Sequence, residues 1–524
     1  MKKKPTLYIV ILCVWVLCLS VLGVSLYFIL TNLQIENLAA KITALILLTL
    51  NTLVLGILWF GSLKDLIFSI AFATTGKKML SRYKDIYETK VDEDYNPKFL
   101  LLYCTRNDFN RDALLKCMAQ KYKNVKTVIL DDSDDEEYLN EIDLFANEFD
   151  VEVVRRKEKT GFKAGNLNNY LRNRNDYDYF VVLDSDEVIP CDYINKVLKY
   201  FTYDKKCGAV QARHKATKGN NVFQRLMGLS VGSNGASTQV VKNFYGSNAL
   251  IGHGMTISRE CYLKTGGFPL VVAEDISFAI DIRNNGFDII YAPEIECYEE
   301  FPVNYLSLKK RQCKWTQGNL EYMRKYNSEI TNCKMSWFEK LDLIISHYSL
   351  PIVPVLSFFL IFFTITLGFL GVNVIHYSIF IYTLMIIFLC SPLIPDIFVY
   401  RKDRNFFLIL PYFILNIVTY ASLAPMMIST VFLGLFGKKA TFLVTPKNNE
   451  TFTFGRAVRG TLDSIIFCVI LTAFSLIACQ NILPVLLVFI GCLCAPFVVM
   501  LSNIEIKDNS KNKLRERAKR RFSK

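Results

Sequence analysis

The sequence lacks the paired cysteine motifs of a structural zinc site. It has 15 cysteines in 524 residues, but no two spaced Cys-x-x-Cys pairs, and Cys492-x-Cys494 falls inside an apolar run. We therefore expect neither zinc nor structural disulfides. Internal repeats and low-complexity blocks are also missing, so a repeat architecture is not indicated.

Acidic residues are too few to balance the basic ones. The chain has 48 Asp and Glu against 61 Lys and Arg, a net charge of +13. A nucleic-acid partner would be one explanation, but the excess lies in loops beside apolar segments and in the tail. Anionic lipid headgroups account for that placement better. We expect a lipid bilayer and no nucleic acid among the partners.

Hydrophobicity divides the chain into membrane and soluble parts. The hydrophobic fraction of 52% and the mean hydropathy of +0.25 are too high for a soluble enzyme and too low for an all-membrane protein. Residues 7–30 and 42–60 carry no charge, and each is long enough to span a bilayer. The first could pass for a signal peptide, but its length and the second run directly after it favour an anchor. Residues 1–75 are thus predicted to hold two spans.

A second apolar region, residues 341–503, follows a polar middle. Its apolar runs cover residues 343–370, 374–398, 406–436, 465–479 and 482–501. The loops between them and the tail 504–524 are basic, which predicts that they lie in the cytoplasm. Because both flanks of 406–436 are basic and Pro411 and Pro425 interrupt it, we expect interfacial or re-entrant helices there. The predicted total is six spans in a multi-pass cell-membrane protein.

The middle part, residues 76–340, reads as a cytoplasmic α/β domain. Apolar strands near 99–104, 127–130 and 151–155 alternate with helices near 112–121 and 136–148. Repeated strand–helix–strand order is typical of a parallel sheet.

Two aspartates end another buried strand of this domain. Asp184 and Asp186 follow the apolar run that begins at Tyr179. Open α/β sheets bind ligands at the carboxyl ends of their strands, and hard carboxylate oxygens suit Mg²⁺ or Mn²⁺. The motif therefore indicates a metal–nucleotide site, although an Asp-x-Asp alone is more typical of an acidic turn after a strand.

Other strand ends carry polar residues suited to a nucleotide. Thr105 and Asp108 follow the first strand, and Asp131 and Asp132 follow the second; either pair alone is also typical of a turn or a solvated acidic loop. In Gly161-Phe-Lys-Ala-Gly-Asn-Leu-Asn168, Lys163 precedes a helix predicted to begin near Asn166, where phosphate binding and a glycine-containing loop with Asn caps are both reasonable.

Taken in order, these motifs resemble the membrane-embedded processive family 2 glycosyltransferases, of which cellulose synthase is the best-known member. The motifs are Lys163-Ala-Gly-Asn-Leu-Asn168, Asp184-Ser-Asp186, Ala273-Glu-Asp275, Arg311-Gln-Cys-Lys-Trp315 and Thr441-Phe-Leu-Val-Thr-Pro-Lys447. The resemblance covers residues 99–447. It implies a GT-A (Rossmann-like) domain inserted between transmembrane helices, an interface helix near 303–333, and a C-terminal channel with a gating loop at 438–456.

For the donor side, the resemblance implies a UDP-sugar whose nucleotide contacts Asp184 and whose metal, Mg²⁺ or Mn²⁺, contacts Asp186 and Asp184. Arg311 and Lys314 would bind the pyrophosphate. Both depart from the family's usual Gln-x-x-Arg-Trp, since glutamine and arginine are typical at these positions. A basic amphipathic helix on the membrane is compatible with the same residues. Thr445 and Lys447 of the gating loop would reach the phosphates.

For the acceptor side, the resemblance implies that Asp275 is the catalytic base, with Glu274 beside it. A helix dipole would hold Asp275 ionised, although helix capping alone explains the pair. One base without a nucleophile predicts inversion at the transferred sugar. Trp315 offers a ring for a pyranose. His253, with no partner visible in the sequence, is a candidate to line the polymer entrance.

The expected function is polymerisation of a UDP-sugar and translocation of the growing polysaccharide. UDP-glucose, giving a β-glucan such as cellulose, is the first expectation, because the loop at 442–447 is most similar to that of glucan synthases. Synthesis of hyaluronan, a chitin-like polymer or poly-N-acetylglucosamine is the nearest alternative. A non-processive transferase acting on a lipid carrier, and a non-catalytic scaffold, belong to other classes. No regulatory domain is expected after the last span.

Overall fold

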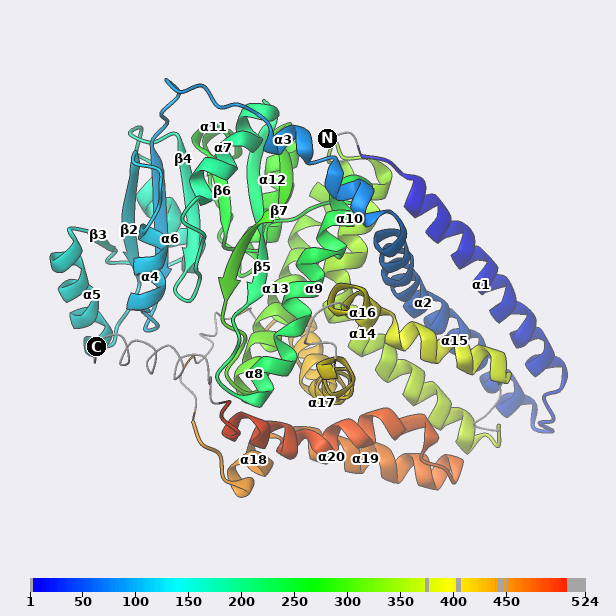
Figure 1. The fold of residues 1–524 in the computed structure, drawn as a ribbon. Helices are drawn as coiled ribbons and strands as arrows, with labels where there is room; N and C mark the ends of the chain where they lie inside the picture. The colour runs from blue at the N-terminus through cyan, green and yellow to red at the C-terminus, as the bar shows by residue number, and fades with distance from the viewer. Residues whose placement is uncertain are drawn as a thin grey trace, which may run out of the picture.

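The computed structural model describes residues 3–372, 377–401, 407–438, 440, 447 and 450–506. A seven-stranded sheet with its covering helices forms one side of the molecule, and long apolar helices gather on the other (Figure 1). The helix α13 (Tyr305–Asn332) lies between the two groups. Asn304 is the N-cap of this helix, and its side-chain oxygen accepts a hydrogen bond from the backbone N–H of Ser307 at 2.9 Å.

The sheet is parallel except for one strand. Its spatial order is β3-β2-β1-β4-β6-β5-β7, and β6 runs antiparallel to both neighbours. The parallel α/β sheet expected from the sequence is thus found; the four-residue β6 is too short for its direction to be predicted from periodicity. The strands are β1 Phe99–Thr105, β2 Val125–Asp131, β3 Glu152–Arg155, β4 Tyr179–Asp184, β5 Cys207–Ala216, β6 Met255–Ser258 and β7 Asp288–Glu299.

Helices cover both faces of this sheet, which explains why its central strands are apolar throughout. In β1, Phe99, Leu101 and Tyr103 pack into one buried cluster, whereas Leu100 and Leu102 pack into another on the opposite face. A strand buried on both faces loses the alternation of polar and apolar residues. The helices of this half are α3 Lys84–Tyr87, α4 Arg111–Met118, α5 Glu136–Phe149, α6 Phe162–Leu171, α7 Tyr193–Tyr203, α8 Val222–Met227, α9 Leu229–Ala236, α10 Thr238–Tyr245, α11 Arg259–Thr265 and α12 Glu274–Asn284.

Register brings the predicted site to one edge of the sheet. Thr105 at the end of β1 pairs with Asp131 at the end of β2, and Cys104 pairs with Asp184 at the end of β4. The loops that follow these strands therefore leave the sheet side by side.

Seven helices among the described residues are long and apolar enough to cross a membrane, one more than the six spans predicted. The additional one is α17, a continuous helix that passes through Pro425 and is largely buried in the protein. It is drawn nearly end-on in Figure 1, where α19 and α20 run across the view. The helices of this half are α1 Thr6–Thr31, α2 Leu38–Ser81, α14 Trp337–Phe369, α15 Ile379–Cys390, α16 Ile394–Tyr400, α17 Ile409–Leu435, α18 Phe454–Gly460, α19 Leu462–Cys479 and α20 Leu486–Met500.

A buried carboxylate, Asp342 of α14, ties the two halves together. It accepts a hydrogen bond from the Tyr8 hydroxyl of α1 at 2.6 Å and from the backbone N–H of Ser247 at 2.7 Å. The ammonium groups of Lys242 from α10 and Lys64 from α2 lie 3.5 and 4.0 Å from its oxygens. Four helices, α1, α2, α10 and α14, thus meet at one fully buried charge.

Candidate active site

A cavity of about 1170 Å³ lies at the carboxyl ends of β1 and β4 and extends between the helices beyond them. It collects most of the residues that the sequence singled out. Those that line it are Thr105, Asp108, Asp132, Lys163, Asp184, Asp186, His253, Glu274, Asp275, Arg311, Lys314, Trp315 and Lys447. Asp131 is not among the lining residues, and Thr445 lies outside the described residues.

Asp184 is paired with Lys163. Helix α6 begins at Phe162, four residues earlier than predicted, so Lys163 sits in its first turn and reaches across to Asp184. The same ammonium donates to the carbonyl of Gly252 at 2.8 Å. Burial would raise the pKa of Asp184, but the ammonium outweighs it and holds that pKa below its ordinary value. Asp184 is therefore kept as an anion.

Asp186 belongs to a second ion-pair group, built around the ammonium of Lys447. That ammonium lies 3.0 Å from an oxygen of Asp186 and 3.0 Å from an oxygen of Asp108, and it also contacts the Ser185 hydroxyl. Asp186 additionally accepts the backbone N–H of Glu300 at 3.0 Å. Asp108 accepts the hydroxyl of Thr105 at 2.9 Å, which turns Asp108 toward this group. The Lys447 ammonium therefore lies between Asp108, in the loop after β1, and Asp186, in the loop after β4.

The predicted nucleotide ligands Asp131 and Asp132 have arginine partners that the sequence reading missed. Arg155 Nε lies 2.7 Å from Asp131, whose other oxygen accepts the N–H of Ser133 at 2.8 Å. Arg156 grips both oxygens of Asp132, at 2.8 and 2.6 Å. Asp131 is thus turned away from the cavity and stabilises the loop, which departs from the expected role. Arg155 ends β3 and Arg156 follows it, and both reach these aspartates because β3 pairs with β2.

Glu274 and Asp275 open helix α12 as predicted, and burial acts on the pKa of both carboxyl groups. The helix dipole was expected to keep Asp275 ionised. Burial instead raises the pKa of Asp275, against the opposing hydrogen bond from the Ile276 N–H. Burial and the neighbouring Asp275 carboxylate raise the pKa of Glu274 to about 7. Because a Cβ on Gly252 would lie only 3.2 Å from Asp275 Oδ2, the glycine lets the loop approach this carboxylate closely.

Arg311 is held between two aromatic rings of the α13 region. Its guanidinium carbon lies 4.6 Å from the ring centroid of Phe301 and 4.5 Å from that of Trp315. Trp315 thus stacks on Arg311 with one face, while 44% of it stays exposed. Arg311 makes no ion pair with any carboxylate among the described residues, so its charge is available to an anion in the cavity. Burial lowers the pKa of Lys314 on the same helix, against the attraction of Asp184.

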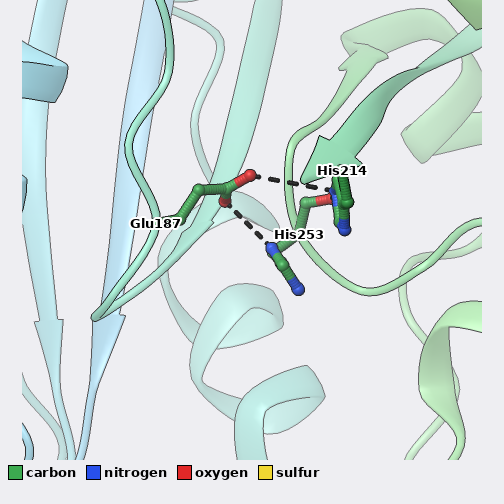
Figure 2. Close-up of side chains that lie close together, drawn as sticks. All are labelled: Glu187, His214 and His253. Atoms are coloured by element: carbon green, nitrogen blue, oxygen red, sulfur yellow. Dashed lines mark hydrogen bonds and ion pairs between the residues drawn. The ribbon is translucent and has the colours of Figure 1, made fainter. Parts of the chain in front are cut away.

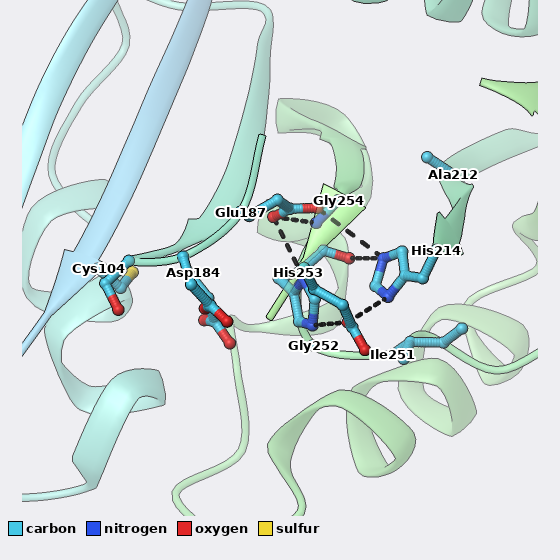
Figure 3. A network of polar contacts seen from close by, with 12 residues as sticks. Cys104, Asp184, Glu187, Ala212, His214, Ile251, Gly252, His253 and Gly254 are labelled. Carbon is cyan, nitrogen blue, oxygen red and sulfur yellow. Dashed lines mark hydrogen bonds and ion pairs between the residues drawn. The ribbon is translucent and has the colours of Figure 1, made fainter. Parts of the chain in front are cut away.

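His253 has partners, contrary to the sequence reading. Its Nδ1 lies 3.3 Å from Glu187 and its Nε2 lies 3.1 Å from Glu299. Its ring stacks on that of His214 with centroids 4.2 Å apart (Figure 2). The loop Gly252–Gly254 carries His253 into this network, beside but apart from Asp184 (Figure 3). The partners could not be found in the sequence, because no local motif links them.

In chemical terms, one cavity holds anionic oxygens with compensating cations on one side and a carboxyl pair of raised pKa on the other. The first arrangement suits a metal and a phosphorylated leaving group. The second suits proton transfer near neutral pH.

Comparison with known proteins identifies the segment that carries these residues. Residues 104–318 match the model of the family described as "Glycosyltransferase like family 2". Poly-beta-1,6-N-acetyl-D-glucosamine synthase of Staphylococcus aureus strain MSSA476 is 24% identical over 268 residues, which cover 50% of this chain and 64% of the relative. The protein of the same name from strain MW2 matches equally. The chain thus spans a little less than two thirds of these curated relatives.

Two solved structures are among those similar to this fold. A mannosyltransferase of Pyrobaculum calidifontis, in complex with GDP-Man and Mn²⁺, is 18% identical and covers 74% of this chain and 100% of its own, with a TM-score of 0.48. Residues 1–349 of S. aureus TarS are 14% identical to this chain, with a TM-score of 0.34. The match covers 59% of this chain and 92% of the TarS chain. The family match, together with the α/β sheet, confirms the expected GT-A-like fold and the resemblance to polysaccharide synthases.

Proposed function

We propose that this chain, whose residues 104–318 form a family 2 glycosyltransferase domain, is a membrane-embedded polysaccharide synthase that uses a nucleoside diphosphate sugar. The observation that carries the proposal is the single cavity shared by Asp184 and Asp186 at a strand end and by Glu274 and Asp275 at a helix start. Seven long apolar helices support a membrane protein. A cytoplasmic catalytic side follows from the basic loops between them.

On the donor side, the carboxylates of Asp184 and Asp186 fit Mg²⁺ or Mn²⁺. Their hard oxygens are the ligands these ions prefer, and the Lys447 ammonium between Asp186 and Asp108 acts as a stand-in cation. When bound, the metal would supply Lewis-acid neutralisation of the pyrophosphate. Lys163 keeps Asp184 anionic, and Arg311 adds a positive charge at the same cavity.

On the acceptor side, Asp275 would take the proton of the attacking hydroxyl. Its burial and raised pKa improve a carboxylate as a base near neutral pH. In-line attack without a covalent intermediate would invert the anomeric centre. Trp315 offers its exposed ring area to the sugar, although Arg311 already stacks on it.

For the transferred sugar, we propose N-acetylglucosamine ahead of glucose. The glucose expectation rested on the loop at 442–447, of which only Lys447 is among the described residues. The curated relatives are named as synthases of poly-β-1,6-N-acetyl-D-glucosamine, which favours the alternative. We further propose that α17 lies at the membrane interface and that the other six long helices span, in keeping with its orientation across α19 and α20.

The test is polymer synthesis by the purified chain in liposomes. With Mg²⁺ or Mn²⁺, radiolabelled UDP-N-acetylglucosamine should give high-molecular-weight label, and UDP-glucose should give less. Asp275→Asn should abolish it, whereas Asp112→Asn, at an exposed helix position outside the cavity, should not. Label confined to a lipid fraction would instead indicate a carrier glycosyltransferase. No transfer from any donor would contradict the proposal.

A further inference from the structure

A compact group of nitrogen and oxygen ligands lies beside the proposed donor site. Glu187 comes from the loop after β4, His214 from β5 and His253 from the loop before β6 (Figure 2). One ligand atom from each of the three lies within 4.8 Å of the others. We infer that Glu187, His214 and His253 bind a transition-metal ion, zinc being the best match, at a site separate from Asp184 and Asp186.

The distance between Glu187 and His253 matches the ligand spacing of a metal site, and the distance between Glu187 and His214 is somewhat longer. Glu187 Oε2 lies 3.3 Å from His253 Nδ1, and Glu187 Oε1 lies 3.9 Å from His214 Nε2. Zinc with bonds of about 2.0–2.2 Å in tetrahedral geometry sets its ligand atoms roughly 3.3–3.6 Å apart. His214 Nε2, which lies 3.0 Å from the carbonyl oxygen of His253, would leave that contact and move toward Glu187 to bind the ion. Two histidines and one glutamate are also a known zinc ligand set in proteins.

Glu299 occupies the position of an outer-shell partner. One of its oxygens, Oε2, lies 3.1 Å from His253 Nε2 and 3.2 Å from His214 Nδ1. These are the ring nitrogens that face away from Glu187. Metal-bound histidines usually donate their second N–H to a carboxylate, which fixes the tautomer and the ring direction. A single carboxylate here would orient both imidazoles toward the same point.

Glu187 is the independent sign that an ion is needed. It is fully buried, its Oε2 accepts the N–H of Gly254 at 2.9 Å, and its Oε1 accepts no hydrogen bond from the described residues. Leaving a buried charged acceptor unsatisfied is costly. A Cβ at Gly254 would collide with both Glu187 and His214, so only glycine leaves this space open. The alternative to a bound metal is a proton on the His253 ring, which would then pair with the Glu187 carboxylate.

The ligand chemistry separates this site from the donor site. Imidazole nitrogens favour zinc and similar ions, whereas the all-oxygen group at Asp184 and Asp186 favours Mg²⁺ or Mn²⁺. Cys297 lies beside the site, but it belongs to no Cys-x-x-Cys pair, which is why the cysteine pattern led us to expect no zinc. A metal here would join three separate segments next to Gly252, whose carbonyl binds Lys163. The inference stands independently of the proposed function.

Metal analysis of the full-length protein tests it without any activity measurement. After dialysis against a weak chelator, we expect about one zinc per chain by mass spectrometry. His214→Gln and His253→Gln should each lose the metal, while Asp186→Asn, which removes a ligand of the proposed donor site, should keep it. Metal retained in both histidine variants and lost in Asp186→Asn would overturn the assignment.

X-ray absorption spectroscopy of the wild-type protein identifies the metal ligands directly, so it tests the proposal even where the histidine variants do not fold. A zinc-loaded sample should show two imidazole ligands with nitrogen and oxygen atoms at about 2.0–2.2 Å. Cobalt-substituted protein should absorb visible light with the spectrum of a nitrogen–oxygen site. Folded, monodisperse protein that takes up neither zinc nor cobalt, or zinc without imidazole ligands, would show that protons occupy the cluster instead.

Discussion

The two sides of the cavity treat their carboxylates differently. On the proposed donor side, each of the lining acids Asp108, Asp132, Asp184 and Asp186 lies within 4 Å of a lysine or arginine nitrogen. On the acceptor side, Glu274 and Asp275 make no such ion pair within the part of the chain that the structure describes. The lysine beside Asp184 thus lowers the pKa of that acid, whereas burial raises the pKa of Glu274 and Asp275 and leaves them able to take a proton. The same carboxyl group can therefore serve as a charged ligand where a cation lies beside it, and as a proton acceptor where none does.

The largest effect is expected from removing the proposed base, Asp275, and this change tests directly whether the two groups of carboxylates have different roles. Asp275→Asn keeps the shape of the side chain but cannot accept a proton, so transfer should fall roughly 10²–10⁴-fold, the usual contribution of general-base catalysis. Incorporation of labelled sugar into polymer measures it. Retention of most of the activity, with normal donor binding, would remove Asp275 from that role.

The second largest effect is expected on stability. Arg156→Met leaves Asp132 buried without its partner, which should cost about 3–5 kcal/mol in the free energy of unfolding. The matched control is Arg111→Met, since the pair of Arg111 with Glu148 is largely exposed and should cost no more than about 1 kcal/mol. Thermal unfolding in detergent compares the two. Equal losses would show that the donor-side pairs are not structural.

A smaller change is expected when Lys447 is replaced. Lys447→Met removes the ammonium that competes for Asp186 and Asp108, so Mn²⁺ should bind severalfold more tightly in the absence of nucleotide. Electron paramagnetic resonance of free Mn²⁺ measures this directly. Lys447→Arg keeps the charge and serves as the control. Unchanged or weaker Mn²⁺ binding in Lys447→Met would contradict the stand-in role.

The smallest effect is a shift in pH dependence. Transfer should rise with pH as the acceptor pair loses its protons, and level off above about 7, the pKa to which burial and Asp275 raise Glu274. The sign follows because a base works only when deprotonated. Glu274→Gln removes the neighbouring charge, so the rising limb of kcat/KM should move to lower pH. An unmoved limb would mean that the two acids do not share a titration.

The sequence predicted those parts of the site that depend on residues close together in the chain. The strand ending at Asp184 and the helix start at Asp275 each follow from an apolar run and its neighbours. The arginine partners of Asp131 and Asp132 depend on β3 lying beside β2, which one sequence does not specify. The group around His253 depends on β5, β6 and β7 lying side by side, and periodicity does not specify the order or register of strands in a sheet.

The buried position of Asp342 bears on attempts to purify the proposed catalytic domain by itself. A fragment of residues 76–340 would keep Lys242 and Ser247 but lose the carboxylate that both contact, together with Tyr8 and Lys64. The α10 ammonium would then be left in an apolar cut surface. The protein is therefore best prepared with its helices in detergent or nanodiscs, and a truncated version is expected to aggregate.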